Sequence, residues 1–382
     1  MLSVNNRAVH WIATDDELAR ILARHEGASR YALDTEFSMG KTYGTTLALL
    51  QLGWDDEIAL IDATVVNLAP LARLFASDAL AYFHAAGGDL DILDDTVGAR
   101  PRALYDTQIA AQFLGWSTPS LATLIHELLG VTLDKSLQRT DWLVRPLSDA
   151  ARHYAASDVA YLFEAGELLD QQLNDLGRRD WVLEECRDVL ARVSTPTPPE
   201  ELWWRLAKAS SIPPNKRLGA QRLCVLRDQR AQRRDRPPSH ILSDDAVVAL
   251  ASNPPATPDA LLRLKGMGAL PEPFIRDVVA TLHAPADGDV VRPLPRRALD
   301  GDLEPLLNTL VAVATQKAAD LTVDAKLLAN KKDVTDYLTG DGTRYQLAWR
   351  REVIGADFDA LRQGHAAVVV RGDRLAIVNL PS

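Results

Sequence analysis

The sequence has little cysteine and no long apolar run. Of its 382 residues only Cys186 and Cys224 are cysteine, which gives neither a disulfide framework nor the paired spacing of a zinc site. No apolar stretch approaches the roughly 18 residues that a membrane span needs, and the N-terminus lacks the charged-then-apolar pattern of a signal peptide. These absences exclude disulfide scaffolds and membrane-spanning proteins, and we expect a cytoplasmic protein with no membrane partner.

Negative charge outweighs positive charge, with 52 Asp and Glu against 42 Lys and Arg. The formal net charge of −10 argues against a nucleic-acid partner, but the distribution is more informative than the sum. One basic strip runs from Arg205 to Arg236, opposed only by Asp228 and Asp235. Its other members are Lys208, Lys216, Arg217, Arg222, Arg227, Arg230, Arg233 and Arg234. The strip is either a solvated helix face or a surface that binds phosphates, and from this stretch both interpretations stay open.

The length of the chain predicts two or three domains, and two proline-rich stretches mark the boundaries. The first is Ser194–Pro199 and the second is Ala284–Pro295. Strands and helices alternate before the first linker, whereas the rest reads as helical until a final hairpin around Arg371-Gly-Asp-Arg374. We therefore predict three domains, at residues 1–193, 200–283 and 296–382.

The first domain has the pattern of an α/β fold. A capping box at Thr14-Asp-Asp-Glu17 predicts a helix through about His25. Three closely spaced apolar segments then predict an antiparallel meander, and two later ones have the rhythm of parallel strands joined by crossover helices. The five segments are Tyr31–Phe37, Thr45–Gly53, Ile58–Ile61, Leu80–His84 and a strand that ends near Tyr105.

Asp34 and Glu36 are the first candidates for chemistry. Because they are two residues apart on a strand, their side chains point to the same face. Alternating charges on an exposed edge strand would explain them without a site. However, the segment is otherwise apolar, and a buried carboxylate pair is costly unless a cation neutralises it. Hard divalent cations prefer carboxylate oxygens, so the pair favours a metal site.

Further polar residues follow in three segments. Tyr154 and Asp158 are four apart in a helical pattern, so both project from one face, one turn apart. Asp89 also has a structural explanation, as the N-cap of a helix that runs to Val97. Asp106 likewise reads as the N-cap of a helix at Thr107–Leu114. His84, at a strand end, reads more readily as a packed group than as a ligand.

Taken together, these segments resemble a known superfamily. The motifs Asp34-Thr-Glu-Phe37, His84-Ala-Ala-Gly-Gly-Asp89, Asp106-Thr-Gln108 and Tyr154-Ala-Ala-Ser-Asp158 resemble those of DEDDy 3′–5′ exonucleases. More closely, Asp134-Lys-Ser136, Arg139-Thr-Asp-Trp142 and Arg145-Pro-Leu147 resemble the bacterial ribonuclease D family. The stretch Arg227–Pro237 resembles a first HRDC (helicase and RNase D C-terminal) domain. Asp324–Ala329 with Trp349-Arg350 resembles a second, divergent one.

The resemblance implies a ribonuclease H-like α/β exonuclease domain, with a mixed sheet flanked by helices, followed by two small, mainly helical HRDC-like domains. It implies hydrolysis from RNA 3′ ends, those of tRNA precursors among them, by a monomer that releases nucleoside 5′-monophosphates. Two Mg²⁺ or Mn²⁺ ions would be held by Asp34, Glu36, Asp89 and Asp158, and Tyr154 would orient the attacking water. Weaker candidates for substrate contacts are Thr35, Phe37, His84, Lys135, Trp142 and Arg145. Those for phosphate contacts are Arg230, Arg233 and Arg234.

Two other functions stay open on the sequence alone. A 3′–5′ DNA exonuclease would carry the same acidic motifs. A non-catalytic RNA-binding module would keep the fold, and loss of any one of the four acidic residues would favour it, but all four are present. The phosphate-binding loop Gly-x-x-x-x-Gly-Lys-Ser/Thr is absent, so no helicase of that type is attached.

Overall fold

A computed structural model describes residues 2–134, 136–137, 140–192, 197–285, 287–291, 299–340, 342 and 344–381. Contacts divide the chain into two compact units. The larger unit comprises Met1–Phe37, Leu47–Val193 and Arg297–Ser382, and the smaller unit comprises Ser38–Thr46 and Ser194–Arg296. The three predicted domains stay a prediction, and the contacts group the first and the third of them in one unit.

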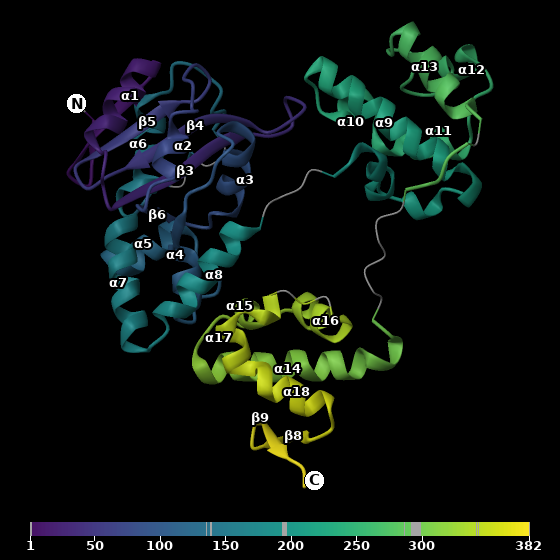
Figure 1. Ribbon diagram of the computed structural model, residues 1–382. Coiled ribbons are helices and arrows are strands. Elements are labelled where there is room, and N and C mark those ends of the chain that lie inside the picture. The colour runs from purple at the N-terminus through teal and green to yellow at the C-terminus, as the bar shows by residue number, and fades with distance from the viewer. Residues whose placement is uncertain are drawn as a thin grey trace. The chain divides into compact units, whose positions relative to one another are not determined.

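A seven-stranded mixed sheet lies in the N-terminal part of the larger unit (Figure 1), with strand order β1-β2-β5-β4-β3-β6-β7. Strand β1 pairs antiparallel with β2 and β4 pairs antiparallel with β5, whereas β2–β5, β3–β6 and β6–β7 are parallel. The strands are β1 (Ser3–Val4), β2 (Arg7–Ile12), β3 (Arg30–Ser38), β4 (Thr46–Gly53), β5 (Glu57–Asp62), β6 (Leu80–Phe83) and β7 (Ala103–Asp106).

In the described residues up to 192, eight helices follow or connect these strands. The capping box at Thr14 and Glu17 opens the first of them, as predicted. The helices are α1 (Asp15–Arg24), α2 (Leu71–Phe75), α3 (Gly87–Thr96), α4 (Thr107–Gln112), α5 (Leu121–Leu129), α6 (Asp149–Ala160), α7 (Leu162–Asp175) and α8 (Arg179–Ala191).

The sheet buries a separate core on each face. Because successive strand residues point to opposite faces, Ala32 packs with the cluster that includes α6 residues, whereas its neighbour Leu33 packs with the cluster that includes α1. Along β5, Ile58 and Ala59 divide between the two cores in the same way. The parity of β3 therefore decides which residues face α6.

Most of the predicted elements are confirmed. The segments at residues 31–37, 45–53 and 58–61 are the adjacent strands β3, β4 and β5, and the later strands are parallel as expected. Strands β1 and β2 were not predicted from the sequence. Asp89 is not an N-cap, because α3 begins two residues earlier at Gly87 and Asp89 lies in its first turn. Asp106 is the N-cap of α4, as predicted.

The smaller unit contains helices and no strand among its described residues from 197 to 291, as predicted. Its long helix α9 (Arg217–Arg234) packs with later helices around buried apolar residues such as Leu223, Val247 and Phe274. The segments are η1 (Pro199–Arg205), η2 (Ala209–Ser211), η3 (Pro214–Lys216), α10 (Pro238–Ile241), α11 (Asp244–Ser252), α12 (Pro258–Leu262) and α13 (Glu272–His283). The connection between β3 and β4 joins this unit through Tyr43, whose hydroxyl donates to Asp228 at 2.8 Å.

The C-terminal part of the larger unit is helical and ends in the predicted hairpin (Figure 1), whose strands are β8 (Ala366–Arg371) and β9 (Arg374–Asn379). Its helical segments are η4 (Gly301–Leu303), α14 (Glu304–Leu321), α15 (Ala325–Leu328), α16 (Lys331–Thr339), η5 (Arg344–Gln346), α17 (Ala348–Arg350), the π-helical η6 (Arg351–Gly355) and α18 (Ala356–Arg362). No helix among the described residues is both long and apolar enough to cross a membrane.

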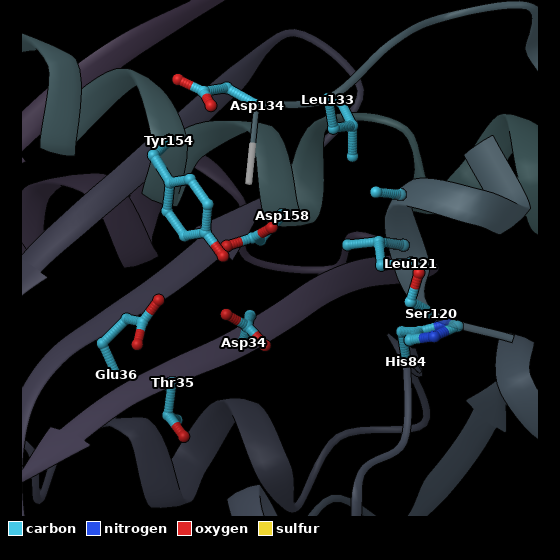
Figure 2. Close-up of a pocket in the computed structure, with 11 residues that line it drawn as sticks. Asp34, Thr35, Glu36, His84, Ser120, Leu121, Leu133, Asp134, Tyr154 and Asp158 are labelled. Atoms are coloured by element: carbon cyan, nitrogen blue, oxygen red, sulfur yellow. The ribbon is translucent and has the colours of Figure 1, made fainter. Parts of the chain in front are cut away.

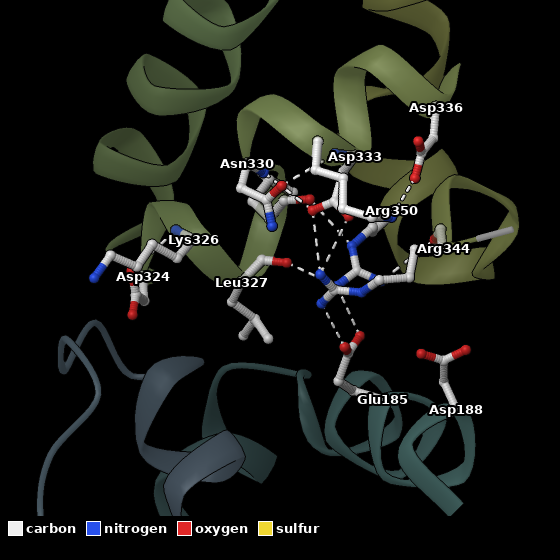
Figure 3. Close-up of polar contacts among 12 residues, drawn as sticks. Glu185, Asp188, Asp324, Lys326, Leu327, Asn330, Asp333, Asp336, Arg344 and Arg350 are labelled. Atoms are coloured by element: carbon white, nitrogen blue, oxygen red, sulfur yellow. Dashed lines mark hydrogen bonds and ion pairs between the residues drawn. The ribbon is translucent and has the colours of Figure 1, made fainter. Parts of the chain in front are cut away.

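A buried ionic cluster joins this C-terminal part to α8 (Figure 3). Glu185, 2 % exposed, pairs with Arg344 at 2.7 Å and with Arg350 at 2.9 Å. Arg350 is 1 % exposed and also donates to the Leu327 and Leu328 carbonyls. Arg344 pairs in addition with Asp333 at 3.1 Å, so two carboxylates balance two guanidinium groups.

Apolar contacts reinforce the same junction. The Trp349 ring lies 4.8 Å from that of Phe113 and 5.8 Å from that of Trp181, measured between centroids. The backbone N–H of Asp324 donates to the Gln112 carbonyl at 2.9 Å. The C-terminal helices and the sheet therefore share one continuous core.

Glu185→Gln should destabilise the protein by about 3–5 kcal/mol, because it leaves the buried guanidinium group of Arg350 and the half-buried one of Arg344 short of one negative charge. The matched control is Asp180→Asn, an exposed change on the same helix that should stay within about 0.5 kcal/mol of wild type. Urea unfolding of the full-length chain measures both. Equal free energies of unfolding for the two variants would show that the cluster does not hold the junction.

Candidate metal centre

The candidate site opens where strands β3 and β6 part. Their pairing register runs from Arg30↔Leu80 to Ala32↔Tyr82, and β3 continues beyond it through Asp34 and Glu36. The carboxyl ends of parallel strands are the usual place for a ligand crevice. Here β3, β6 and β7 bring their carboxyl ends to the same edge of the sheet.

Asp34, Glu36 and Asp158 converge in this opening. One carboxylate oxygen from each lies within 4.8 Å of those of the other two. Figure 2 shows the three side chains around one space, with Tyr154 on α6 directed toward Asp158. The predicted shared faces, Asp34 with Glu36 on the strand and Tyr154 with Asp158 on the helix, are both confirmed.

Small residues bring α6 close enough to the sheet for this convergence. Ala151, Ala155 and Ala156 are buried in the core that also contains Ala32 of β3. At Gly53 of β4, an added Cβ would lie 3.4 Å from the side chain of Val159. Larger side chains on this face of α6 would hold Asp158 away from Asp34 and Glu36.

The electrostatics of the cluster favour a bound cation. Burial, and then repulsion from Asp158 and Asp89, raises the pKa of Glu36 to about 8. Burial raises the pKa of Asp158 to about 7, and burial with repulsion from the other three carboxylates raises the pKa of Asp34 well above its usual value. Buried carboxylates of like charge are stabilised by a divalent cation, so the donor set fits such an ion.

Asp89 lies beside these three carboxylates, outside the group of mutual neighbours. Its Oδ1 accepts a hydrogen bond of 2.5 Å from the Thr35 hydroxyl, and burial raises its pKa to about 7. The geometry follows from strand parity, since Thr35 points away from the face that bears Asp34 and Glu36.

His84 lines the pocket but both ring nitrogens have partners. One nitrogen lies 3.0 Å from the Thr107 hydroxyl and the other lies 3.0 Å from the Pro119 carbonyl. Burial lowers its pKa, which favours the neutral imidazole. His84 therefore forms a wall of the pocket. Phe37 is not among the lining residues and lies near Gly88.

Two of the predicted substrate contacts, Trp142 and Arg145, make contacts within the protein. Trp142 is 3 % exposed and packs behind Tyr154, with ring centroids 5.9 Å apart. The Arg145 guanidinium pairs with the buried carboxylate of Asp62 at 2.6 Å and donates to the Ala48 carbonyl at 2.7 Å. A buried aspartate at the end of β5 thus explains this arginine. Lys135 lies outside the described residues.

The pocket, of about 250 Å³, has lining residues that the sequence did not identify. Ser120 is the N-cap of α5, a local signal that the sequence carries but that says nothing of its proximity to Asp34. The other lining residues that were not candidates for the site are Leu121, Ala122, Leu133 and Asp134, the last of which begins the motif Asp134-Lys-Ser136. Leu121 and Ala122 begin α5 and the other two follow that helix, so their position at the pocket depends on tertiary packing.

The basic strip of the smaller unit divides into paired and unpaired cations. Arg222 pairs with Asp287 and Arg227 with Asp244. The Arg230 guanidinium lies over the Phe274 ring, 4.4 Å from its centroid. Arg233 and Arg234 are exposed and make no ion pair with any residue that the structure describes. Only part of the strip is therefore available to a ligand.

Comparison with known proteins agrees with this geometry. A family model for 3′–5′ exonucleases matches residues 9–174, and one for the HRDC domain matches residues 220–271. A ribonuclease D from Jannaschia sp. is 34% identical, over 97% of this chain and 100% of that protein. One from Acidiphilium cryptum is 33% identical, over 97% of each. The chain belongs to the ribonuclease D family.

Solved structures agree with the family assignment. Escherichia coli RNase D, described as an exoribonuclease involved in structured RNA processing, is 26% identical with a TM-score of 0.79, over 94% of this chain and 99% of that one. A protein from Bifidobacterium adolescentis, 21% identical with a TM-score of 0.78, shares the fold over 94% and 97%. The predicted family, the exonuclease fold with an HRDC domain and the 3′–5′ exoribonuclease activity are confirmed. The second HRDC-like domain stays a prediction.

The raised pKa values predict a pH-dependent response to metal. Glu36, Asp89 and Asp158 bind protons more tightly in the folded state, with pKa values of about 7 to 8, than in the unfolded state, where carboxyl pKa values are near 4. The metal-free protein should therefore lose stability as pH rises from about 4 through about 8. Saturating Mg²⁺ should raise the melting temperature more at about pH 8 than at about pH 6, because fewer protons must be displaced.

Thermal melts with EDTA or with Mg²⁺ at each pH measure this effect. Asp95→Asn, an exposed change on α3, serves as the control and should respond as wild type does. A metal-induced shift of equal size at both pH values would count against the carboxylate cluster as the binding site.

Proposed function

We propose that the pocket binds two divalent ions, Mg²⁺ or Mn²⁺, through Asp34, Glu36, Asp158 and Asp89, and that RNA is shortened there one nucleotide at a time from its 3′ end. The observation that supports this most is the mutual approach of three carboxylates within 4.8 Å. When bound, two such ions lower the pKa of an attacking water and offset the charge on the attacking and leaving oxygens. The proposed product is a nucleoside 5′-monophosphate.

The protein groups have separate roles in this proposal. Asp34 is the candidate to contact both ions, because its charge interacts with all three of the other carboxylates. Tyr154 lines the pocket one helical turn from Asp158, so its hydroxyl orients the attacking water. A free phenol has a pKa near 10, which makes Tyr154 a poor base near neutral pH and favours orientation as its role.

For the substrate, we propose the 3′ ends of tRNA precursors and other structured RNA. The relative from Escherichia coli, described as involved in structured RNA processing, supports this choice. We propose that the protein acts as a monomer in the cytoplasm, where its two buried, unpaired cysteines would stay reduced. A 3′-extended tRNA compared with a DNA strand of the same sequence measures the preference for RNA.

Asp34→Asn should abolish cleavage and Mn²⁺ binding together, whereas Tyr154→Phe should slow cleavage strongly and leave Mn²⁺ binding intact. The first change deletes a charge from the cluster, and the second removes only a hydroxyl. Calorimetric Mn²⁺ titration beside single-turnover cleavage of a 3′-extended tRNA separates the two roles.

The control for both variants is Asp95→Asn, which should match wild type in each assay. If Asp34→Asn retained cleavage within about tenfold of wild type, the two-metal proposal would be wrong. If Tyr154→Phe lost Mn²⁺ affinity but kept its rate per metal-loaded enzyme, Tyr154 would be a ligand rather than an orienting group.

We also propose that Arg230, Arg233 and Arg234 of the HRDC domain contact RNA phosphates, with the exposed Arg233 and Arg234 carrying most of the effect. Changing this exposed pair to Gln should weaken tRNA binding and lower the slope of log affinity against log salt by about one to two units. The measurement is filter binding across a salt series. An Arg222→Gln variant, whose wild-type side chain already pairs with Asp287, should change the slope less. An unchanged slope for the double variant would identify the strip as a solvated face.

A further inference from the structure

Asp106 is a buried carboxylate that holds two helix starts at once. It is 2 % exposed, and its Oδ1 accepts from the Gln108 N–H at 2.9 Å, as the N-cap of α4. The same oxygen accepts from the Ala85 N–H at 2.9 Å, and Oδ2 accepts from the Ala86 N–H at 2.9 Å. An N-cap needs only the first of these bonds, so the other two indicate a second task.

The next residue, Thr107, also contacts the turn that contains Ala85 and Ala86. Thr107 is 0 % exposed. Its hydroxyl donates to the Phe83 carbonyl at 3.0 Å and lies 3.0 Å from a ring nitrogen of His84. Asp106 and Thr107 together therefore hold every residue from Phe83 to Ala86.

The turn that they hold leads directly to Asp89. Ala85 has a φ of +64°, a left-handed conformation that costs a non-glycine residue about 1 kcal/mol or more. The turn ends at Ala86, the N-cap of α3, whose own side chain offers no capping group. Asp89 stands in the first turn of that helix and meets Thr35 there.

We propose that Asp106 is a positioning residue for metal binding. By bonding the Ala85 and Ala86 N–H groups, it fixes the start of α3 and thereby directs Asp89 toward Asp34 and Glu36. The inference rests on the proposed metal site. The inference adds to that site a residue that contacts neither metal nor substrate. It also explains why both carboxylate oxygens of the buried Asp106 accept backbone hydrogen bonds. Partners that orient metal ligands in this way contribute about 10–100-fold to metal affinity.

The test is Asp106→Asn in the full-length chain. The amide keeps one acceptor oxygen but cannot accept from both Ala85 and Ala86, because its nitrogen is a donor. Calorimetric titration of the metal-free variant should give Mn²⁺ affinity about 10–100-fold weaker than wild type, and cleavage should recover toward the wild-type rate at high Mn²⁺. A purely structural role would lower the melting temperature of the variant and leave its Mn²⁺ affinity unchanged, which would overturn the proposal.

A second pair of variants decides the matter if Asp106→Asn fails to fold. Thr107→Val keeps the volume and loses the hydroxyl, and it should weaken Mn²⁺ binding in the same direction. Thr107→Ser restores the hydroxyl and should restore the affinity. We call the hydrogen bonds of Asp106 and Thr107 with residues 83–86 the clamp. Equal Mn²⁺ affinity in the two variants would show that this clamp does not position Asp89.

The Mn²⁺ affinity of Asp34→Asn tests the metal site separately from the positioning role of Asp106. Wild-type Mn²⁺ affinity in Asp34→Asn would reject the proposed site. Loss of binding in Asp34→Asn together with wild-type affinity in Asp106→Asn would reject the positioning role alone.

Discussion

Repulsion among half-buried carboxylates is the constraint on which the rest of the structure depends. Asp34, Glu36 and Asp158 approach within 4.8 Å of one another, and burial raises the pKa of each. Of the described residues that line the pocket, only His84 could carry a positive charge, and its pKa is lowered. The fold must therefore hold these groups together against their mutual repulsion until a cation arrives. Rigid elements that meet in a large core supply that restraint, since loops alone could relax apart.

The four carboxylates come from one strand and from helices on two different faces of the sheet. Asp34 and Glu36 share the parity of Ala32 and face α6, which carries Asp158. Thr35 has the opposite parity and meets Asp89 from α3. The end of β3 thus lies between Asp158 of α6 on one face of the sheet and Asp89 of α3 on the other. This geometry explains why Asp89 stands beside the other three carboxylates, and why the start of α3 needs a clamp of its own.

Local periodicity accounts for what the sequence predicted well. The spacing of Asp34 with Glu36 and of Tyr154 with Asp158 needs only the two- and four-residue repeats of strand and helix, and the N-cap at Asp106 is a short-range pattern. What no local pattern indicates are the long-range partners. Arg145, for which a substrate contact stays a prediction, pairs with a buried aspartate 83 positions earlier in the chain. Partners at that separation are set by the strand order, which no local pattern encodes.

Helix α8 links the C-terminal helices to the edge of the sheet that carries the clamp. Its Glu185 pairs with Arg344 and Arg350, and the next residue, Cys186, accepts the Asp106 N–H at its sulfur at 3.4 Å. Adjacent residues on one helix thus contact the C-terminal part on one side and the end of β7 on the other. The helix can keep both contacts only while its position is fixed. The segment after residue 297 therefore supports the strand end on which the positioning of Asp89 depends, although none of its described residues lines the pocket.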